Sequence, residues 1–438
     1  MNMKLRNIPF SPPDMTEKEA ALVREAILSG WITTGPKTKE LERQISEYVH
    51  TEKTVCLNSA TAAMEMVLHL LGVGPGDEVI LPAYTYTATA SVVTHVGAKV
   101  VMVDSQKDNV EMDYDKLAGA ITEKTKVIVP VDLGGVVADY DRVSEIVERK
   151  KGLFKPNNAL QAKIGRIVVS ADCAHSFGGM RTLRQAQGPK MAGEIADFSS
   201  FSFHAVKNFT TAEGGAMTWK LPFGNEKVPT DVDYMPTVPK KDGETWNELL
   251  YRLSQLFSLH GQNKDALAKT KLGAWEYDII GPWYKCNMTD IMAALGLVQM
   301  ERYKGILERR YEIVNRYNKA IDNLNANLDD NHKVAYLNHR DSEHCSSHHL
   351  YLVRLQGRSR EDANKVIEKM AERGIACNVH YKPLPMMTAY KALGFDIKNY
   401  PNAYHLFENE VSLPLHTKLT DEDIEYVISN FVDIVKNL

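Results

Sequence analysis

The chain has 438 residues, 44% of them hydrophobic and 25% charged, with a formal net charge of −4. This composition is ordinary for a folded protein, and the length predicts one large and one small domain. The slightly acidic balance predicts no nucleic-acid partner and no anionic membrane surface. The N-terminus has no apolar signal-peptide core, and no stretch approaches the roughly 18 to 20 apolar residues of a membrane span. Five widely spaced cysteines favour reduced thiols, so a cytoplasmic location is expected.

Short apolar runs alternate with helical patterns in the first half of the chain. Strands are expected at 78–84, 99–104, 126–133 and 166–172, and helices at 59–71, 85–96, 113–121 and 139–149. The runs are apolar almost throughout, as in strands buried on both faces. Their alternation with helices predicts an α/β fold with a mostly parallel sheet covered on both sides.

The second half changes character at about residue 288. A helical pattern continues to residue 324 and predicts a long helix that joins a large domain (1–320) to a small C-terminal α+β domain (321–438). Within the small domain, strands are expected at 348–355 and 376–381. Three polar stretches resemble insertions, and we expect surface loops there, which tolerate added length at little cost; they are 150–165, 181–191 and 221–245. The alternative for the third stretch is a lid over an active site.

A lysine in the segment SSFSFHAVKNFTTAEGGAMT (199–218) is the first candidate for chemistry. Lys207 is flanked by Ser and Thr and is followed closely by two glycines. Shielding from water lowers the pKa of a lysine, and small polar neighbours allow a cofactor phosphate to approach. This pattern suits a lysine that forms a Schiff base with pyridoxal 5′-phosphate (PLP). Taken alone, a Ser-rich segment with one lysine is more often a solvated loop.

A carboxylate supports this interpretation. Asp172 ends the buried strand in RIVVSADCAHSFGG, where open parallel sheets present residues to ligands. A PLP enzyme needs a carboxylate that keeps the pyridinium nitrogen protonated, and Ala174 is small enough for a ring to lie above it. The alternative for Asp172 is a helix cap or a surface ion pair.

Two further features fit a phosphate-bearing, planar cofactor. Asn58-Ser59-Ala60-Thr61 opens a helix after a strand, and the free N–H groups of a helix start bind phosphate. Ser and Thr are also ordinary N-caps. Tyr86 follows a strand end and could stack on a ring, unless it is a core tyrosine. The GVGPGD turn (72–77) follows a helix and precedes a strand, the reverse of a dinucleotide fingerprint, which argues against a nicotinamide enzyme.

Two other clusters are assigned no chemistry. HCSSHHL (344–350) has no second ligand pair at zinc spacing, so no metal site is predicted. Cys173 has no assignable base and is predicted to be a packing residue.

Several segments together resemble one family. SFHAVKNFTTAEGG, ADCAHSFGG, NSATAA and LPAYTYTATA, in this order and spacing, are similar to the DegT/DnrJ/EryC1/StrS family of sugar aminotransferases. The resemblance includes the opening segment IPFSPPDMTEKEA, CNMTDIMAALGLVQM, GIACNVHYKPLPMMTAY and VSLPLHTKLTDEDIEYV. It covers nearly the whole chain outside the inserts.

The resemblance implies fold type I of the PLP-dependent transferases and a homodimer with active sites at the interface. It assigns Lys207 as the Schiff-base lysine and Asp172 as the pyridinium partner. The remaining matches are cofactor contacts by Ser59, Ala60, Thr61, Tyr86, His175 and Ser202, and a substrate border formed by His380 and Tyr381.

Two positions depart from the family pattern. In WYKCNMTD, Lys285 stands where the family has an Asn that reaches the neighbouring subunit's phosphate, and we keep it as a phosphate ligand. In PVDLGG, Asp132 stands in place of the family's histidine, and no substrate contact is assigned to this turn.

The expected reaction is amino transfer from an amino acid, by family analogy L-glutamate, to a keto nucleotide-sugar in amino-sugar or polysaccharide biosynthesis. The alternatives are a PLP-dependent sugar dehydratase, a cyclitol aminotransferase, and a non-catalytic PLP-binding regulatory protein. Lys207 argues against the dehydratase, whose relatives replace this lysine.

Overall fold

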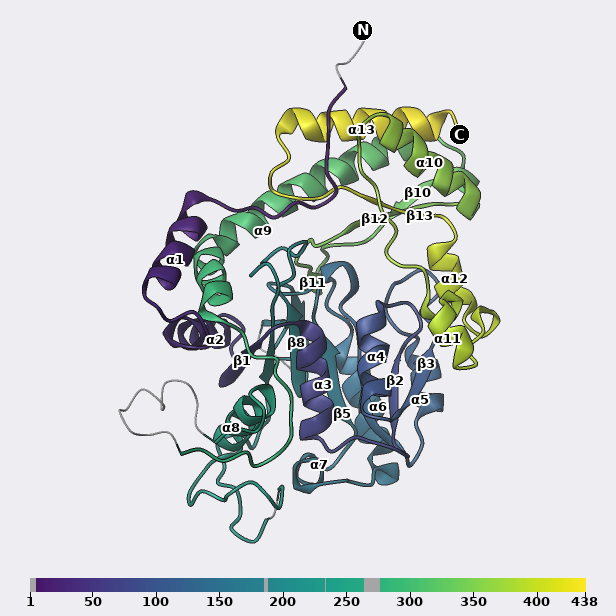
Figure 1. The fold of residues 1–438 in the computed structure, drawn as a ribbon. Coiled ribbons are helices and arrows are strands. Elements are labelled where there is room, and N and C mark those ends of the chain that lie inside the picture. The colour runs from purple at the N-terminus through teal and green to yellow at the C-terminus, as the bar shows by residue number, and fades with distance from the viewer. Residues whose placement is uncertain (1–4, 185–187, 233, 264–275) are drawn as a thin grey trace.

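The computed structural model describes residues 5–184, 188–232, 234–263 and 276–438. Its centre is a seven-stranded sheet with the strand order β1-β9-β8-β5-β4-β2-β3 (Figure 1). Strand β9 is antiparallel to both of its neighbours, and the other strands all run parallel to one another. The strands are β1 (Lys53–Leu57), β2 (Glu78–Pro82), β3 (Lys99–Val103), β4 (Thr125–Ile128), β5 (Val168–Asp172), β8 (Phe198–Ser202) and β9 (Gly215–Trp219). The predicted mostly parallel α/β sheet is confirmed.

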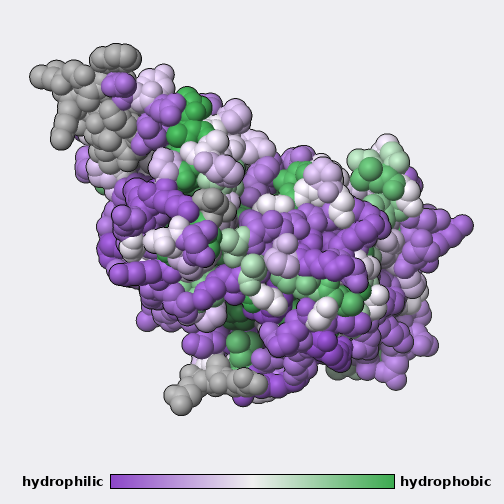
Figure 2. All heavy atoms as spheres, turned by 90° about the horizontal axis from the view of Figure 1, so that it is seen from below, coloured by the Kyte–Doolittle hydropathy of each residue, from purple (hydrophilic) through white to green (hydrophobic). Residues whose placement is uncertain are grey.

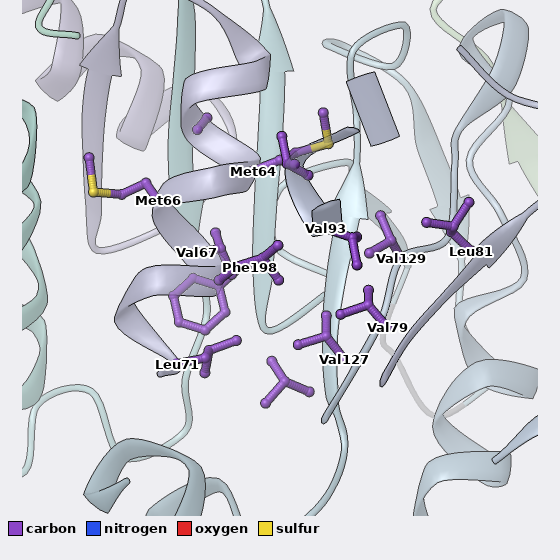
Figure 3. Close-up of a cluster of buried hydrophobic side chains, with 14 of the residues drawn as sticks. Met64, Met66, Val67, Leu71, Val79, Leu81, Val93, Val127, Val129 and Phe198 are labelled. Atoms are coloured by element: carbon purple, nitrogen blue, oxygen red, sulfur yellow. The ribbon is translucent and has the colours of Figure 1, made fainter. Parts of the chain in front are cut away.

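Helices cover both faces of this sheet because side chains alternate along each strand. In β2, Val79 and Leu81 belong to one core cluster, and Ile80 belongs to a second cluster on the opposite face. The first face is covered by α3 (Ala60–Leu70), α4 (Thr87–His95) and α8 (Trp246–Ser258). The second is covered by α2 (Pro36–Tyr48), α5 (Tyr114–Ala120), α6 (Tyr140–Lys150) and the start of α9. Figure 3 shows Met64 and Val67 of α3 packed with valines of the sheet on the first face.

Helix α9 (Asp290–Asn325) runs from the large sheet to the C-terminal elements (Figure 1). Its first half buries Tyr303 and Ile306 in the core of the large sheet, and its second half buries Ile313 and Ile321 in the C-terminal core. Helix α1 (Glu17–Leu28) packs against it. The domain division at residue 320 falls inside this helix and stays a prediction.

The C-terminal core lies between α9 and a three-stranded antiparallel sheet, β10-β12-β13. Its elements are β10 (Val334–Tyr336), β12 (Tyr351–Leu355), α10 (Arg360–Glu372), β13 (Glu410–Leu413) and α13 (Asp421–Lys436). Two short helices, α11 (Thr388–Ala392) and α12 (Pro401–Phe407), precede β13.

Three local expectations were wrong. The polar stretch 150–165 contains helix α7 (Ala159–Ile164), because Leu160 is buried and the buried Gln161 donates to the Leu71 carbonyl. The stretch 181–191 contributes to two short strands, β6 (Met180–Thr182) and β7 (Pro189–Met191). These form a small sheet with β11 (His344–Cys345). Residues 185–187 of this stretch lie outside the described residues. No strand forms at 376–381, where Asn378 makes an isolated bridge to Ser412. The described part of 221–245, which excludes 233, holds no helix or strand.

The face shown in Figure 2 is mostly hydrophilic, with small hydrophobic patches between charged side chains. Among the helices of the described residues, none combines the length and apolar character that a membrane crossing needs.

Candidate active site

A cavity of about 480 Å³ opens at the carboxyl ends of the parallel strands. Asp172 ends β5, Ser202 ends β8, and the turn after β1 supplies Ser59. Residues remote in sequence meet here because parallel strands all end at the same edge of the sheet. The lining includes every predicted site residue except Lys285: Ser59, Ala60, Thr61, Tyr86, Asp172, His175, Ser202, Lys207, His380 and Tyr381.

Lys207 lies on the loop between β8 and β9, and its backbone N–H donates to the His204 carbonyl at 2.9 Å. Removal from water lowers the pKa of Lys207 to about 8, although the Asp172 carboxylate acts in the opposite direction. At neutral pH far more of such an amine is uncharged than of an ordinary lysine, so it can act as a nucleophile and as a base.

Asp172 is almost completely buried, with 5% of its surface exposed. Its Oδ2 accepts a hydrogen bond from Thr89 Oγ1 at 2.8 Å, and its Oδ1 accepts one from the Ala174 N–H at 3.1 Å. Burial raises the pKa of Asp172, while these two donors and Lys207 act against that rise. Sequence reasoning missed Thr89, although its place in the helix after Tyr86 was a usable signal.

The start of α3 forms a tight cradle against β9. Ser59 is the N-cap, and its hydroxyl accepts from the Ala62 N–H at 3.1 Å. A Cβ atom on Gly215 would lie 2.3 Å from the carbonyl carbon of Ser59 and 2.4 Å from the nitrogen of Ala60. Only glycine permits this approach, which explains the second glycine of the pair after Lys207. Ser202 pairs with Gly215 and is thereby brought near the helix start.

His175 and Tyr381 form the far wall of the cavity. His175 Nδ1 accepts from the Gly134 N–H at 3.2 Å, so the proton of the neutral ring lies on Nε2, which donates to Tyr381 Oη at 3.1 Å. Burial lowers the pKa of His175 well below its ordinary value, which keeps the ring neutral. Tyr86 is 60% exposed at the cavity mouth, with its ring tilted against that of Tyr381.

This set of groups fits pyridoxal phosphate. Lys207 suits the aldehyde, the buried Asp172 carboxylate suits a pyridinium nitrogen, and the start of α3 suits a phosphate. His175 and Tyr381 lie beside the space left for the ring.

The model of the DegT/DnrJ/EryC1/StrS aminotransferase family matches residues 13–432. The chain belongs to this family. One curated relative is the spore coat polysaccharide biosynthesis protein SpsC of Bacillus subtilis (strain 168), which is 32% identical over 435 residues, with 98% of this chain and 97% of the relative covered. Another is the UDP-4-amino-4-deoxy-L-arabinose–oxoglutarate aminotransferase of Shewanella sediminis, 32% identical over 440 residues, with 98% of each covered.

Among solved structures, the chain is similar to Spr1654 of Streptococcus pneumoniae, named as a sugar aminotransferase. The PLP form of Spr1654 has a TM-score of 0.87 and is 52% identical, with 99% of each chain covered. The PMP form has the same TM-score and is 54% identical, with 98% of this chain and 100% of Spr1654 covered. The expected family and fold type I are therefore confirmed. The protein is a sugar aminotransferase with pyridoxal phosphate as its cofactor.

The family's histidine position is occupied by Asp132, which is fully buried beside the cavity. Its carboxylate accepts hydrogen bonds from Ser176 Oγ at 2.6 Å, from Tyr140 Oη at 3.0 Å and from the Ala138 N–H at 3.0 Å. Burial raises the pKa of Asp132 to about 6. In this sugar aminotransferase the residue ties the turn after β4 to the turn after β5.

Lys285 does not line the cavity of its own chain. Its exposed side chain donates to Asn287 Oδ1. The predicted contact of Lys285 with the phosphate of a partner subunit stays a prediction.

The His/Cys cluster has a structural role that the sequence did not reveal. Arg310 of α9 donates to the backbone carbonyls of His348 at 2.7 Å and His349 at 2.6 Å. His349 Nδ1 and the Ser347 carbonyl then hold the side-chain amide of Asn208, at 2.9 and 2.7 Å. The cluster therefore fixes the loop that carries the neighbouring Lys207. In the described part of the chain, no three His, Cys, Asp or Glu side chains could share a metal ion.

Cys173 is fully buried, and burial raises the pKa of its thiol well above the ordinary value. A thiol in this state is not a nucleophile near neutral pH. It donates to Asp132 Oδ2 at 3.4 Å and packs in the core of the large sheet.

Proposed function

We propose that this sugar aminotransferase moves an amino group from L-glutamate to the keto group of a nucleotide-linked sugar. The proposal rests on one observation: Lys207 and Asp172 line the same cavity as the start of α3, which is suited to bind a phosphate. The relatives support the class of acceptor, since one is named for polysaccharide biosynthesis and another for transfer between a UDP-linked amino sugar and oxoglutarate.

Each residue has a separate part in the proposed reaction. Bound pyridoxal phosphate supplies an electron sink for the charge left when a proton leaves the carbon that bears the amine. The uncharged amine of Lys207 takes that proton and returns it, first on the donor and then on the acceptor. Asp172, held by Thr89, keeps a negative charge opposite the pyridinium nitrogen. The N–H groups after Ser59 and the Ser202 hydroxyl bind the phosphate.

The two half-reactions test this proposal separately. Purified protein with bound cofactor is mixed with L-glutamate, and we expect the visible absorbance to fall as 2-oxoglutarate forms. Keto nucleotide-sugars carrying UDP, dTDP or GDP, together with cyclitol ketones, are then added singly, and the true acceptor restores the absorbance. Loss of a keto-sugar without use of glutamate would indicate dehydration and contradict the proposal.

We expect Lys207→Ala to reduce amino transfer by at least about a thousandfold, because no other amine replaces the base. The matched control is Lys220→Ala at the end of β9, where the lysine donates to the His50 carbonyl on the surface. Transfer at the normal rate by the Lys207→Ala protein would refute the role of this lysine.

We further propose a homodimer in which Lys285 binds the phosphate in the partner subunit's cavity. Its exposure and its absence from the lining of its own chain's cavity support this arrangement. Lys207→Ala and Lys285→Ala proteins are unfolded together and refolded as a mixture. A hybrid dimer then has one cavity with both lysines intact, so the mixture regains activity that neither variant has alone. Activity no higher than that of the separate variants would refute binding across the interface.

A further inference from the structure

His380 is joined to a buried carboxyl group behind the active-site cavity. His380 Nδ1 lies 2.8 Å from Ser412 Oγ, and this oxygen lies 2.6 Å from Glu410 Oε1. The single proton of the hydroxyl can point toward either partner. The backbone N–H of His380 donates to Glu410 Oε2 at 3.0 Å. Both oxygens of the carboxyl group are therefore directed at the histidine, one of them through the serine.

The backbone fixes this arrangement. Asn378 and Ser412 exchange two backbone hydrogen bonds, of 3.1 and 2.8 Å, in an antiparallel bridge. In an antiparallel pair, the residue two positions after one partner lies opposite the residue two positions before the other, and their side chains point to the same face. His380 and Glu410 occupy those positions, and the ring of Phe10 stacks on the other side of His380 at 5.4 Å.

The two ends of this chain of groups lie in different cavities. His380 lines the active-site cavity, and because Nδ1 is engaged with Ser412, its Nε2 is the nitrogen available to a ligand there. Glu410 lines a second cavity of about 370 Å³ between the C-terminal sheet and the large sheet. Tyr84 borders that cavity and donates to the His380 carbonyl at 2.7 Å.

Among the described residues, the cations near Glu410 form no ion pair with its carboxyl group. Arg360 of α10 donates to the backbone carbonyl of Glu410 at 2.8 Å, and Arg354 of β12 pairs with Asp108 at 2.9 Å. Within the described ranges, no cation forms a salt bridge with the Glu410 side chain. The remaining titratable groups that face it are Tyr84, Cys377, Tyr381 and His380. Burial raises the pKa of Glu410 to about 8, although Ser412, the His380 N–H and the charge of Arg360 act against that rise.

We propose that Glu410, acting through Ser412, determines which ring nitrogen of His380 carries the proton, and so supplies and recovers a proton at the cavity side of His380. The inference rests on the proposed function, because it concerns a proton that amino transfer requires. The keto oxygen of the acceptor leaves as water, and that oxygen must receive protons to leave.

The proton transfers balance without a charged imidazole. In the starting state, neutral Glu410 donates to Ser412, Ser412 donates to His380 Nδ1, and His380 carries its proton on Nε2. When Nε2 gives up its proton, the Ser412 proton passes to Nδ1 and the Glu410 proton passes to Ser412, which leaves a carboxylate. When Nε2 takes back a proton from the active-site cavity, the Nδ1 proton returns to Ser412 and the Ser412 proton returns to Glu410, which restores the starting state. Burial and the charge of Lys207 lower the pKa of His380 to about 3, so the ring itself does not hold a second proton near neutral pH.

Nitrogen NMR of the holoenzyme labelled with ¹⁵N-histidine tests this positioning role without turnover. The His380 signals are assigned by their loss in His380→Gln. We expect the His380 proton to move from Nε2 to Nδ1 as the pH rises through about 8 in the wild type. Glu410→Gln preserves the hydrogen bonds but not the titration, so its His380 keeps the proton on Nε2 from pH 6.5 to 9.5. The matched control Glu408→Gln, on the surface beside His405, titrates as the wild type does.

Kinetics provide a second measurement. We expect Glu410→Gln to lower kcat at least about tenfold with KM little changed, and to abolish the fall in kcat above pH 8. Ser412→Ala, which interrupts the chain of groups, lowers kcat similarly and leaves His380 without the titration. A His380 tautomer that does not change with pH in the wild type, or that titrates equally in Glu410→Gln, would overturn the inference. The NMR titration needs no substrate, so it tests the role of Glu410 even if no acceptor reacts. Failure of every acceptor would refute the proposed function and leave this inference standing.

Discussion

At the scale of single residues, the active site depends on side chains that orient others. Asp172 can face a cofactor nitrogen because Thr89 and the Ala174 N–H hold its two oxygens. Lys207 is held through its neighbour Asn208, whose amide is fixed at both ends. Sequence motifs identified Asp172 and Lys207, whose chemistry is distinctive. They did not identify Thr89 or Asn208, because a threonine or asparagine acquires such a role only from its contacts.

Thr89→Val tests this support. Valine has the same shape but removes the donor to Asp172 Oδ2 and the 2.8 Å contact with Thr85 Oγ1. A hydrogen bond to a charged group contributes about 1.5 to 3 kcal/mol, so we expect cofactor affinity to fall about tenfold or more. Fluorescence titration of the apoprotein with pyridoxal phosphate measures this loss.

Thr94→Val is the control, because Thr94 is exposed on the same helix and its hydroxyl donates to the Ser91 carbonyl. Equal affinity of the Thr89→Val protein and this control would show that Thr89 does not support Asp172.

At the scale of elements, helix ends are completed by residues from other helices. The N-cap of α2 is Gly35, which offers no side chain. Asp290, the first residue of α9, accepts from the N–H groups of Gly35, Lys37 and Thr38 at 2.8, 3.1 and 2.9 Å, and from the Thr38 hydroxyl at 2.7 Å. The sequence predicted α9 well, since its periodicity extends over many turns, but this distant cap is a property of the packed structure.

Asp290→Asn removes the charge and turns an NH₂ group toward donors. We expect it to lower the free energy of unfolding by about 2 to 4 kcal/mol, because buried donors lose their acceptor. Urea denaturation followed by circular dichroism measures the change. Glu308→Gln, an exposed change on the same helix, is the control and is expected to alter stability by less than about 0.5 kcal/mol. A similar effect of the two substitutions would contradict the proposed cap.

The elements that sequence patterns missed are short or irregular. Helix α7 has six residues, and β6 and β7 have three residues each, too few for periodicity to emerge. The segment ACNVHY (376–381) is predicted to form a strand, yet only Asn378 pairs there, because the following residues turn into the cavity wall at His380 and Tyr381.

At the scale of the whole molecule, buried carboxyl groups couple folding to pH. The pKa of Glu410 is raised from its ordinary value of 4.5 to about 8, so the folded protein binds more protons than the unfolded chain between these values. The free energy of unfolding therefore falls as the pH rises through that window. Asp132, with its pKa raised to about 6, acts in the same direction over a lower range.

We expect Glu410→Gln to remove part of this dependence. One group contributes at most about 1.4 kcal/mol for each pH unit, so between pH 6.5 and 8 the variant should lose about 1 to 2 kcal/mol less stability than the wild type. Urea unfolding at the two pH values makes the comparison, with Glu408→Gln as the reference. Equal losses in all three proteins would contradict the assigned state of Glu410.

The sequence by itself determined the family, the mostly parallel sheet, the long helix and the residues with distinctive chemistry, because periodicity and local motifs are written along the chain. Lys207, Asp172 and Ser59 could be named from it, since each lies in a distinctive local motif: a loop with small polar residues, the end of a strand and the start of a helix. Tertiary structure decided which residues support them, because contacts between distant segments have no local signal. The joining of Glu410 to His380 and the capping of α2 by Asp290 arise only when these segments pack together.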